Sequence, residues 1–244
     1  MGQRYANPPI QEVLCFFWLS ERTPWDLTIP GLLYEHLRKE FPRKQHHPAQ
    51  EVNVRPIPED FIHEFRRREQ VWLFSETGNI LIQIGSRVIS LHVLRPYPSW
   101  EVVKLKIHTL WNSLQAILPL IEIEYLSLRY INRFSFPSQQ WELYLTYYPL
   151  WGQTFPSNRI GFAMSTLLTY QGERDACRVQ LYTDMHSPPE QRDLLLDIDY
   201  FLAKPQGIAP QESLEWLEYA HQQISVIFES CITDKLRQLF GEVV

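Results

Sequence analysis

The amino-acid sequence predicts an α+β fold with an antiparallel sheet in two meander groups, each followed by a helix. Short runs rich in β-branched, aromatic or alternating apolar residues cluster along the chain, and turn signals separate them. Apolar residues at helical three–four spacing follow each cluster. Strands grouped in this way are typical of α+β domains, and they are not expected of βαβ units.

The first group of elements extends from a strand at 10–19 to a helix at 100–117. A short helix over 32–41 and a surface connection over 43–58 follow the first strand. The connection is predicted because that segment is rich in proline and polar residues. Three strands, at 71–75, 80–84 and 88–94, then form a meander in which Gly85-Ser86 makes a hairpin turn. Ser99 is the expected cap of the helix at 100–117.

The second group starts with a long strand at 122–136. Its alternation places Leu128 and Tyr130 on one face, and Arg129 and Arg133 on the other. Further strands are expected at 162–170, 178–186 and 193–203. One long helix of roughly 45 Å, from about 210 to 240, should pack across the sheet.

The length and charge limit the classes of function. The 244 residues suit one α+β domain, 1–244, or alternatively two interlocked halves, 1–120 and 121–244. A formal charge of −5 argues against binding nucleic acid through bulk positive charge. Three scattered cysteines without a CxxC pair predict neither a disulfide framework nor a zinc site. Because an apolar signal segment and a long apolar run are both missing, we expect a cytoplasmic protein that does not bind membranes.

Three sequence segments together resemble a known family. They are the Asn7-Pro8-Pro9-Ile10-x-Glu12-Val13 opening, Leu128-Arg129-Tyr130-Ile131-Asn132-Arg133, and a helix pattern that runs from Leu217 through His221, Ile224 and Phe228 to Ile232-Thr233. The combination resembles a sporadically distributed family of uncharacterised prokaryotic proteins, and the similarity covers nearly the entire chain. The resemblance implies no reaction, cofactor or catalytic residue. The family's patchy distribution is similar to that of accessory genes in mobile or defence loci.

Asp197 and Asp199 are candidate metal ligands, because two carboxylates at i and i+2 share one face of a strand. Asp184 or His186 from a neighbouring strand could complete such a site. The alternative is that both aspartates point away from an apolar face, toward Arg178 or solvent, and this reading predicts no metal.

Three further polar residues are candidates for binding a ligand or anion. Arg129 offers a planar fork to a carboxylate or phosphate, although an ion pair with Glu12 or an aspartate is the simpler expectation. Asn132 lies among apolar neighbours, where an amide binds either backbone or a ligand. His221 interrupts the apolar stripe of the last helix, as a hydrogen-bonded core histidine or as a general base. The chain contains no G-x-S-x-G, Walker A or G-x-G-x-x-G motif, so we predict no catalytic residue and no cofactor.

An aromatic segment provides the remaining candidate site. Five aromatic residues are concentrated in eleven positions: Trp141, Tyr144, Tyr147, Tyr148 and Trp151. Aromatic side chains are enriched at protein interfaces, so the segment is either a docking surface or a cover over the sheet.

The sequence therefore favours a non-enzymatic protein-interaction or regulatory module that binds a protein partner or self-associates. The first alternative is a nucleic-acid-processing enzyme with a metal at Asp197 and Asp199. The second is a small-molecule-binding, helix-grip-like domain with an apolar cavity.

Overall fold

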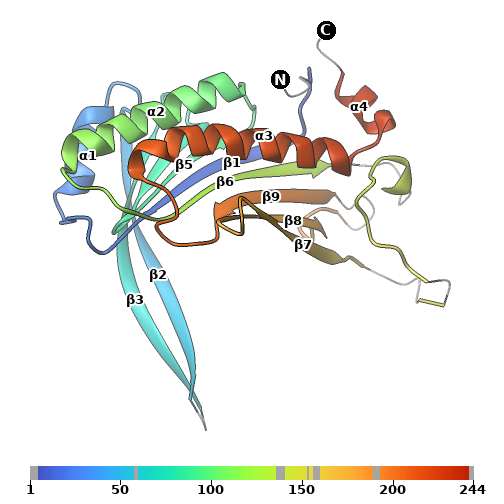
Figure 1. The fold of residues 1–244 in the computed structure, drawn as a ribbon, viewed down its shortest axis with the longest axis horizontal. Helices are drawn as coiled ribbons and strands as arrows, with labels where there is room; N and C mark the ends of the chain where they lie inside the picture. Colours follow the sequence, from blue (N-terminus) through green and yellow to red (C-terminus); the bar gives the residue numbers. More distant parts are fainter. Residues whose placement is uncertain are drawn as a thin grey trace. The chain divides into compact units, whose positions relative to one another are not determined.

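The computed structural model describes residues 5–57, 60–135, 141–152, 154–155, 160–188 and 193–241. The secondary-structure elements in these ranges are, in chain order, β1 (Ile10–Leu19), α1 (Ile29–Leu37), β2 (Arg43–Ile57), β3 (Asp60–Phe74), β4 (Ile80–Ile84), β5 (Val88–Leu94), α2 (Trp100–Ile117), β6 (Ile123–Phe134), β7 (Ala163–Tyr170), β8 (Asp175–Thr183), β9 (Leu194–Leu202), α3 (Ser213–Cys231) and α4 (Asp234–Phe240). The strands form one antiparallel sheet in the order β2-β3-β4-β5-β1-β6-β9-β8-β7 (Figure 1). The predicted α+β class with an antiparallel sheet is confirmed.

The chain divides into two compact units. The N-terminal unit comprises Cys15–Val93 and Pro98–Glu124. The C-terminal unit comprises Met1–Leu14, Leu94–Tyr97 and Tyr125–Val244. The boundaries fall within β1 and β6, so each of these strands contributes residues to both units.

The core of the N-terminal unit lies between its strands and α2. The rings of Phe17 on β1 and Trp111 on α2 stack with centroids 5.3 Å apart, and both side chains are buried. Ser99 caps α2 as expected, since its hydroxyl accepts a hydrogen bond from the Val102 N–H. The turn between β4 and β5 is longer than predicted, because Arg87 adopts a positive φ of 59° and extends the Gly85-Ser86 turn by one residue.

The expectation of a surface connection at 43–58 is wrong. The segment forms β2, which pairs with β3 along its whole length, from Arg43 opposite Phe74 to Ile57 opposite Asp60 (Figure 1). β2 is the outermost strand at its end of the sheet order, and an edge strand tolerates the Pro48 and Pro56 that argued against a strand.

The C-terminal unit has a two-layer core, in which α3 runs along one face of β6 and β9 (Figure 1). The side chains on this face are buried and mostly apolar, among them Leu128, Leu196, Ile198 and Leu181. Among the polar residues on this face is Asp175, which is fully buried. Its carboxylate accepts hydrogen bonds from the Arg174 guanidinium at 2.8 and 2.9 Å, from the Tyr200 hydroxyl at 3.1 Å and from the Trp216 indole at 3.1 Å, so its charge is compensated.

The long C-terminal helix is shorter than expected. α3 ends at Cys231, and α4 starts at Asp234 after two extended residues, Ile232 and Thr233. Ile232 forms an antiparallel bridge with Leu145, which competes with helical hydrogen bonding. The 19 residues of α3 therefore span about 28 Å. No helix in the described ranges is both long enough and apolar enough to cross a membrane.

We expect Trp111→Ala to lower the free energy of unfolding by about 3–5 kcal/mol, because it removes a buried indole and leaves a cavity under Phe17. Leu105→Ala is the matched control on the same helix, since Leu105 is 63% exposed, and it should change stability by less than about 0.5 kcal/mol. Urea denaturation followed by tryptophan fluorescence and circular dichroism measures both. Equal effects of the two substitutions would contradict this packing.

Candidate functional site

The face of the C-terminal sheet opposite α3 carries a ladder of charged and polar side chains, here called the polar face. Its members are Ser127, Arg129 and Arg133 of β6, Asp197 and Asp199 of β9, and Arg178, Gln180 and Tyr182 of β8. The strand register places Asp199 between Arg129 and Arg178, and Gln180 opposite Asp197. Opposite charges therefore alternate across neighbouring strands, an arrangement that stabilises a sheet.

Arg129 and Asp197 form a bidentate ion pair at the centre of this face. The Arg129 Nε donates to Asp197 Oδ1 at 2.7 Å, and its Nη2 donates to Oδ2. The Asp197 side chain is only 2% exposed, whereas that of Arg129 is about one third exposed. The hydrogen bonds to Asp197 raise the pKa of Arg129 above its ordinary value. Both oxygens of Asp197 are thereby occupied by the guanidinium.

Asp199 is the one carboxylate of the ladder with an unsatisfied atom. Its Oδ1 is buried and accepts no hydrogen bond from the described residues. Burial raises the pKa of Asp199 to about 6, and the nearby charge of Asp197 adds to the rise, although Arg129 and Arg178 act in the opposite direction. The charged form of Asp199 is therefore less favourable in the folded protein than in water.

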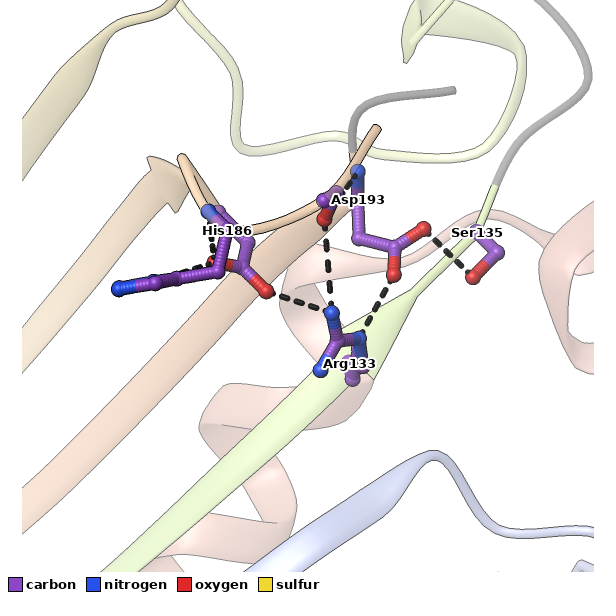
Figure 2. A network of polar contacts seen from close by, with 6 residues as sticks. Arg133, Ser135, His186 and Asp193 are labelled. Carbon is purple, nitrogen blue, oxygen red and sulfur yellow. Dashed lines mark hydrogen bonds and ion pairs between the residues drawn. The ribbon is translucent and has the colours of Figure 1, made fainter. Parts of the chain in front are cut away.

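Arg133 anchors both sides of the β8–β9 connection (Figure 2). Its Nε donates to Asp193 Oδ2 at 2.7 Å, and its Nη2 donates to Asp184 Oδ2 at 2.5 Å. The Ser135 hydroxyl donates to Asp193, and the His186 backbone N–H donates to Asp184 at 2.9 Å. The hydrogen bond from the His186 backbone lowers the pKa of Asp184. The alternation of apolar residues in β6 predicts the face on which Arg133 lies, but no local pattern indicates this network.

A cavity of about 560 Å³ opens beside the Arg129–Asp197 pair. Its walls combine polar side chains of the polar face with apolar side chains from the start of β7 and from the turn after β8. The lining residues are Arg129, Asp197, Gln180, Tyr182, Thr183, Ile160, Gly161, Phe162, Ala163 and Met185. Gly161 permits a close approach of the backbone, since a Cβ there would lie 3.1 Å from Met185 Sδ and 3.2 Å from Thr183 Cβ.

Exposed apolar side chains lie in the cavity lining and in the segment around Trp151, whose ring contacts the cavity-lining Phe162 with centroids 6.3 Å apart. Leu150 and Ile160 are 83% and 73% exposed, and Trp151, Phe155 and Met185 are exposed as well. Trp151 stacks on Phe155 with ring centroids 4.8 Å apart, and Ile160 and Met185 line the cavity itself. We call these five residues the apolar rim.

The aromatic segment mainly packs within the C-terminal unit. Trp141 contacts the ring of Phe162 with centroids 4.9 Å apart, and Tyr144 is buried. The Tyr147 hydroxyl donates to Val179 O at 3.2 Å, and Tyr148 is half-buried. Tyr144 is thus buried, Trp141, Tyr147 and Tyr148 are partly buried, and Trp151 belongs to the apolar rim.

Asn132 and His221 do not converge with Arg129. Both lie on the side of the sheet that faces α3, whereas Arg129 points to the polar face. The Asn132 amide is 2% exposed and donates to Leu196 O at 3.3 Å. The His221 Nδ1 lies 3.1 Å from the Tyr130 hydroxyl. Each therefore has a hydrogen-bond partner within the fold.

Arginines bind two of the four candidate metal ligands. Among the described residues, no three His, Cys, Asp or Glu side chains are grouped closely enough to hold a metal ion. Asp184 is bound to Arg133 and Asp197 to Arg129, so two of the proposed ligands already neutralise arginines.

Comparison of the chain with protein families gives no match, and comparison with curated proteins gives none either.

We expect Asp199→Asn to raise the free energy of unfolding at pH 7.5 by about 1–2 kcal/mol. With a pKa of about 6 in the folded state, against an ordinary value of 3.8, the folded protein holds this proton more tightly than the unfolded chain. Stability should thus fall as pH rises from about 4 to 6 and then remain constant, and the variant should lose this slope. Urea denaturation between pH 4 and 8 measures it.

Asp197→Asn is the matched control two residues away. It should lower stability at pH 7.5, because Arg129 loses its bidentate acceptor. A loss of stability in Asp199→Asn of the same size would contradict the assignment of Asp199 as a destabilised charge.

Proposed function

We propose that the protein is a non-enzymatic interaction or regulatory module that binds a protein partner through the apolar rim and the cavity beside it. The observation that carries the proposal is the exposure of Leu150 and Ile160, together with the neighbouring aromatic rings. On the adjoining polar face, Arg129 binds Asp197 and Arg133 binds Asp193. Exposed apolar clusters bordered by polar residues are typical of protein-interaction sites.

The energetics of docking favour this surface. Covering one Leu or Ile side chain that is largely exposed stabilises a complex by about 1.5–3 kcal/mol, and a buried Trp often contributes more than its neighbours. The polar face adds little electrostatic attraction, because Arg129 and Arg133 are already paired with carboxylates. A partner that inserts an apolar side chain into the cavity would therefore fit better than a highly charged one.

We propose different roles for the two predicted meander groups, each with its following helix. The first meander group supplies a stable core, and the second meander group supplies the binding surface. In line with the family resemblance, we propose that the module acts in the cytoplasm as an accessory subunit of a mobile or defence system.

A second candidate function is the binding of a small molecule. The cavity volume of about 560 Å³ lies within the range of ligand pockets, and Arg129 offers donors beyond the two that bind Asp197. A metabolite that raises the melting temperature of the wild-type chain, but not of Tyr182→Ala, would favour this function.

We expect Ile160→Asp to abolish partner binding, because it places a charge on an exposed apolar position that lines the cavity. Val226→Asp is the matched control, since Val226 is 64% exposed on α3, away from the cavity lining. Tagged chains are purified from the native host and the copurified proteins are quantified by mass spectrometry. A partner retained by wild type and Val226→Asp, and lost from Ile160→Asp, supports the proposal. Identical recovery by all three chains contradicts it.

A further inference from the structure

β7 is the outermost strand at the C-terminal end of the sheet order (Figure 1). Among the described residues its strand neighbour is β8, in a register from Ala163 opposite Tyr182 to Tyr170 opposite Asp175. An edge strand presents backbone N–H and C=O groups that can pair with a further strand.

The composition of β7 does not protect this edge. The eight residues Ala-Met-Ser-Thr-Leu-Leu-Thr-Tyr include no charge, no proline and no glycine. The strand at the other end of the sheet, β2, contains Pro48, Pro56 and several charged residues. Proteins commonly protect edge strands with charges and prolines, so the two edges differ in the feature that prevents strand addition.

We propose that β7 pairs antiparallel with β7 of a second copy of this chain, which joins the two sheets across a two-fold axis. The inference goes beyond the proposed function, since it uses the strand edge and does not require the apolar rim. A two-fold axis perpendicular to the sheet keeps the α3 layers of both copies on the same side. Residues that oppose each other must then both be odd-numbered or both be even-numbered.

The side chains of β7 select one register among those allowed. If the two-fold axis passes beside Leu167, which is 59% exposed, Leu167 of one copy lies opposite Leu167 of the other. Ser165 then faces Thr169, which matches two hydroxyls, and Met164 faces Tyr170. An axis at Thr166 would instead place Ser165 against Leu167, a polar residue against the largest exposed apolar one.

A second copy suits this edge for reasons of charge and geometry. Each chain carries a net charge of −5, but β7 is uncharged, so pairing brings no like charges into opposition. Symmetry repeats every favourable pair outside the axis twice. Eight residues from each copy are fewer than the roughly 20–30 per side of a standard interface, so we expect a weak dimer with a dissociation constant in the micromolar range.

A cysteine at the axis tests the register directly. Opposed residues in an antiparallel pair have Cα atoms about 4.5–5.5 Å apart, which suits a disulfide. Under copper–phenanthroline oxidation, Leu167→Cys should form a covalent dimer. The native cysteines Cys15, Cys177 and Cys231 are buried and should contribute little background.

Thr169→Cys is the matched control on the same exposed side of β7. In the proposed register its two copies are four residues apart along the strand, about 13 Å, which is too far for a disulfide. Equal cross-linking of both variants, or of neither, would overturn the proposal.

Sedimentation velocity from 1 to 200 μM provides a second measurement. We expect wild type, Leu105→Lys and Ile160→Asp to dimerise with rising concentration. Leu167→Lys should remain monomeric with an unchanged circular dichroism spectrum, because it opposes two charges at the axis. A wild-type chain that stays monomeric at 200 μM overturns the proposal. The proposal is also overturned if Ile160→Asp is monomeric while Leu167→Lys still dimerises, because self-association would then depend on the apolar rim.

Discussion

Asp197 is almost completely buried on the sheet face opposite α3, where Arg129 binds both of its oxygens. The alternation of β9 requires this arrangement, since burial of Leu196 and Ile198 under α3 sends Asp197 and Asp199 to the other side. A buried carboxylate without such a partner would be strongly destabilising. The ion pair therefore allows a two-layer unit to carry acidic residues on its uncovered face.

The same ion pair determines which parts of the surface remain available to another molecule. Arg129 is bound to Asp197, and Arg133 is bound to both Asp184 and Asp193, so carboxylates of this chain already engage both guanidinium groups. Two features of this unit are candidates for association. The apolar rim supplies side chains, and the outer edge of β7 supplies backbone hydrogen-bonding groups. These two surfaces have different chemistry, and one can be occupied without the other.

Local patterns in the sequence predicted most strands, the Ser99 cap and the opposite orientations of Arg129 and Asn132, because all of these depend on neighbouring residues. The features that the sequence did not predict depend on contacts between residues far apart in the chain. The break after Cys231 depends on pairing with Leu145, and β2 keeps its prolines because the topology places it at an edge. The sequence suggested an aspartate as partner for Arg129, but the choice of Asp197, 68 residues away, and the Arg133 network required the strand order.

Hydrogen exchange of the backbone amides of β7 at 1 and 200 μM protein tests most directly the proposal that two copies of this chain associate through the outer edge of β7 and not through charged side chains. The account predicts that amides of 163–170 exchange more slowly at the higher concentration, while those of the buried strand β9 exchange at the same rate at both. Exchange of 163–170 that is independent of concentration would contradict it.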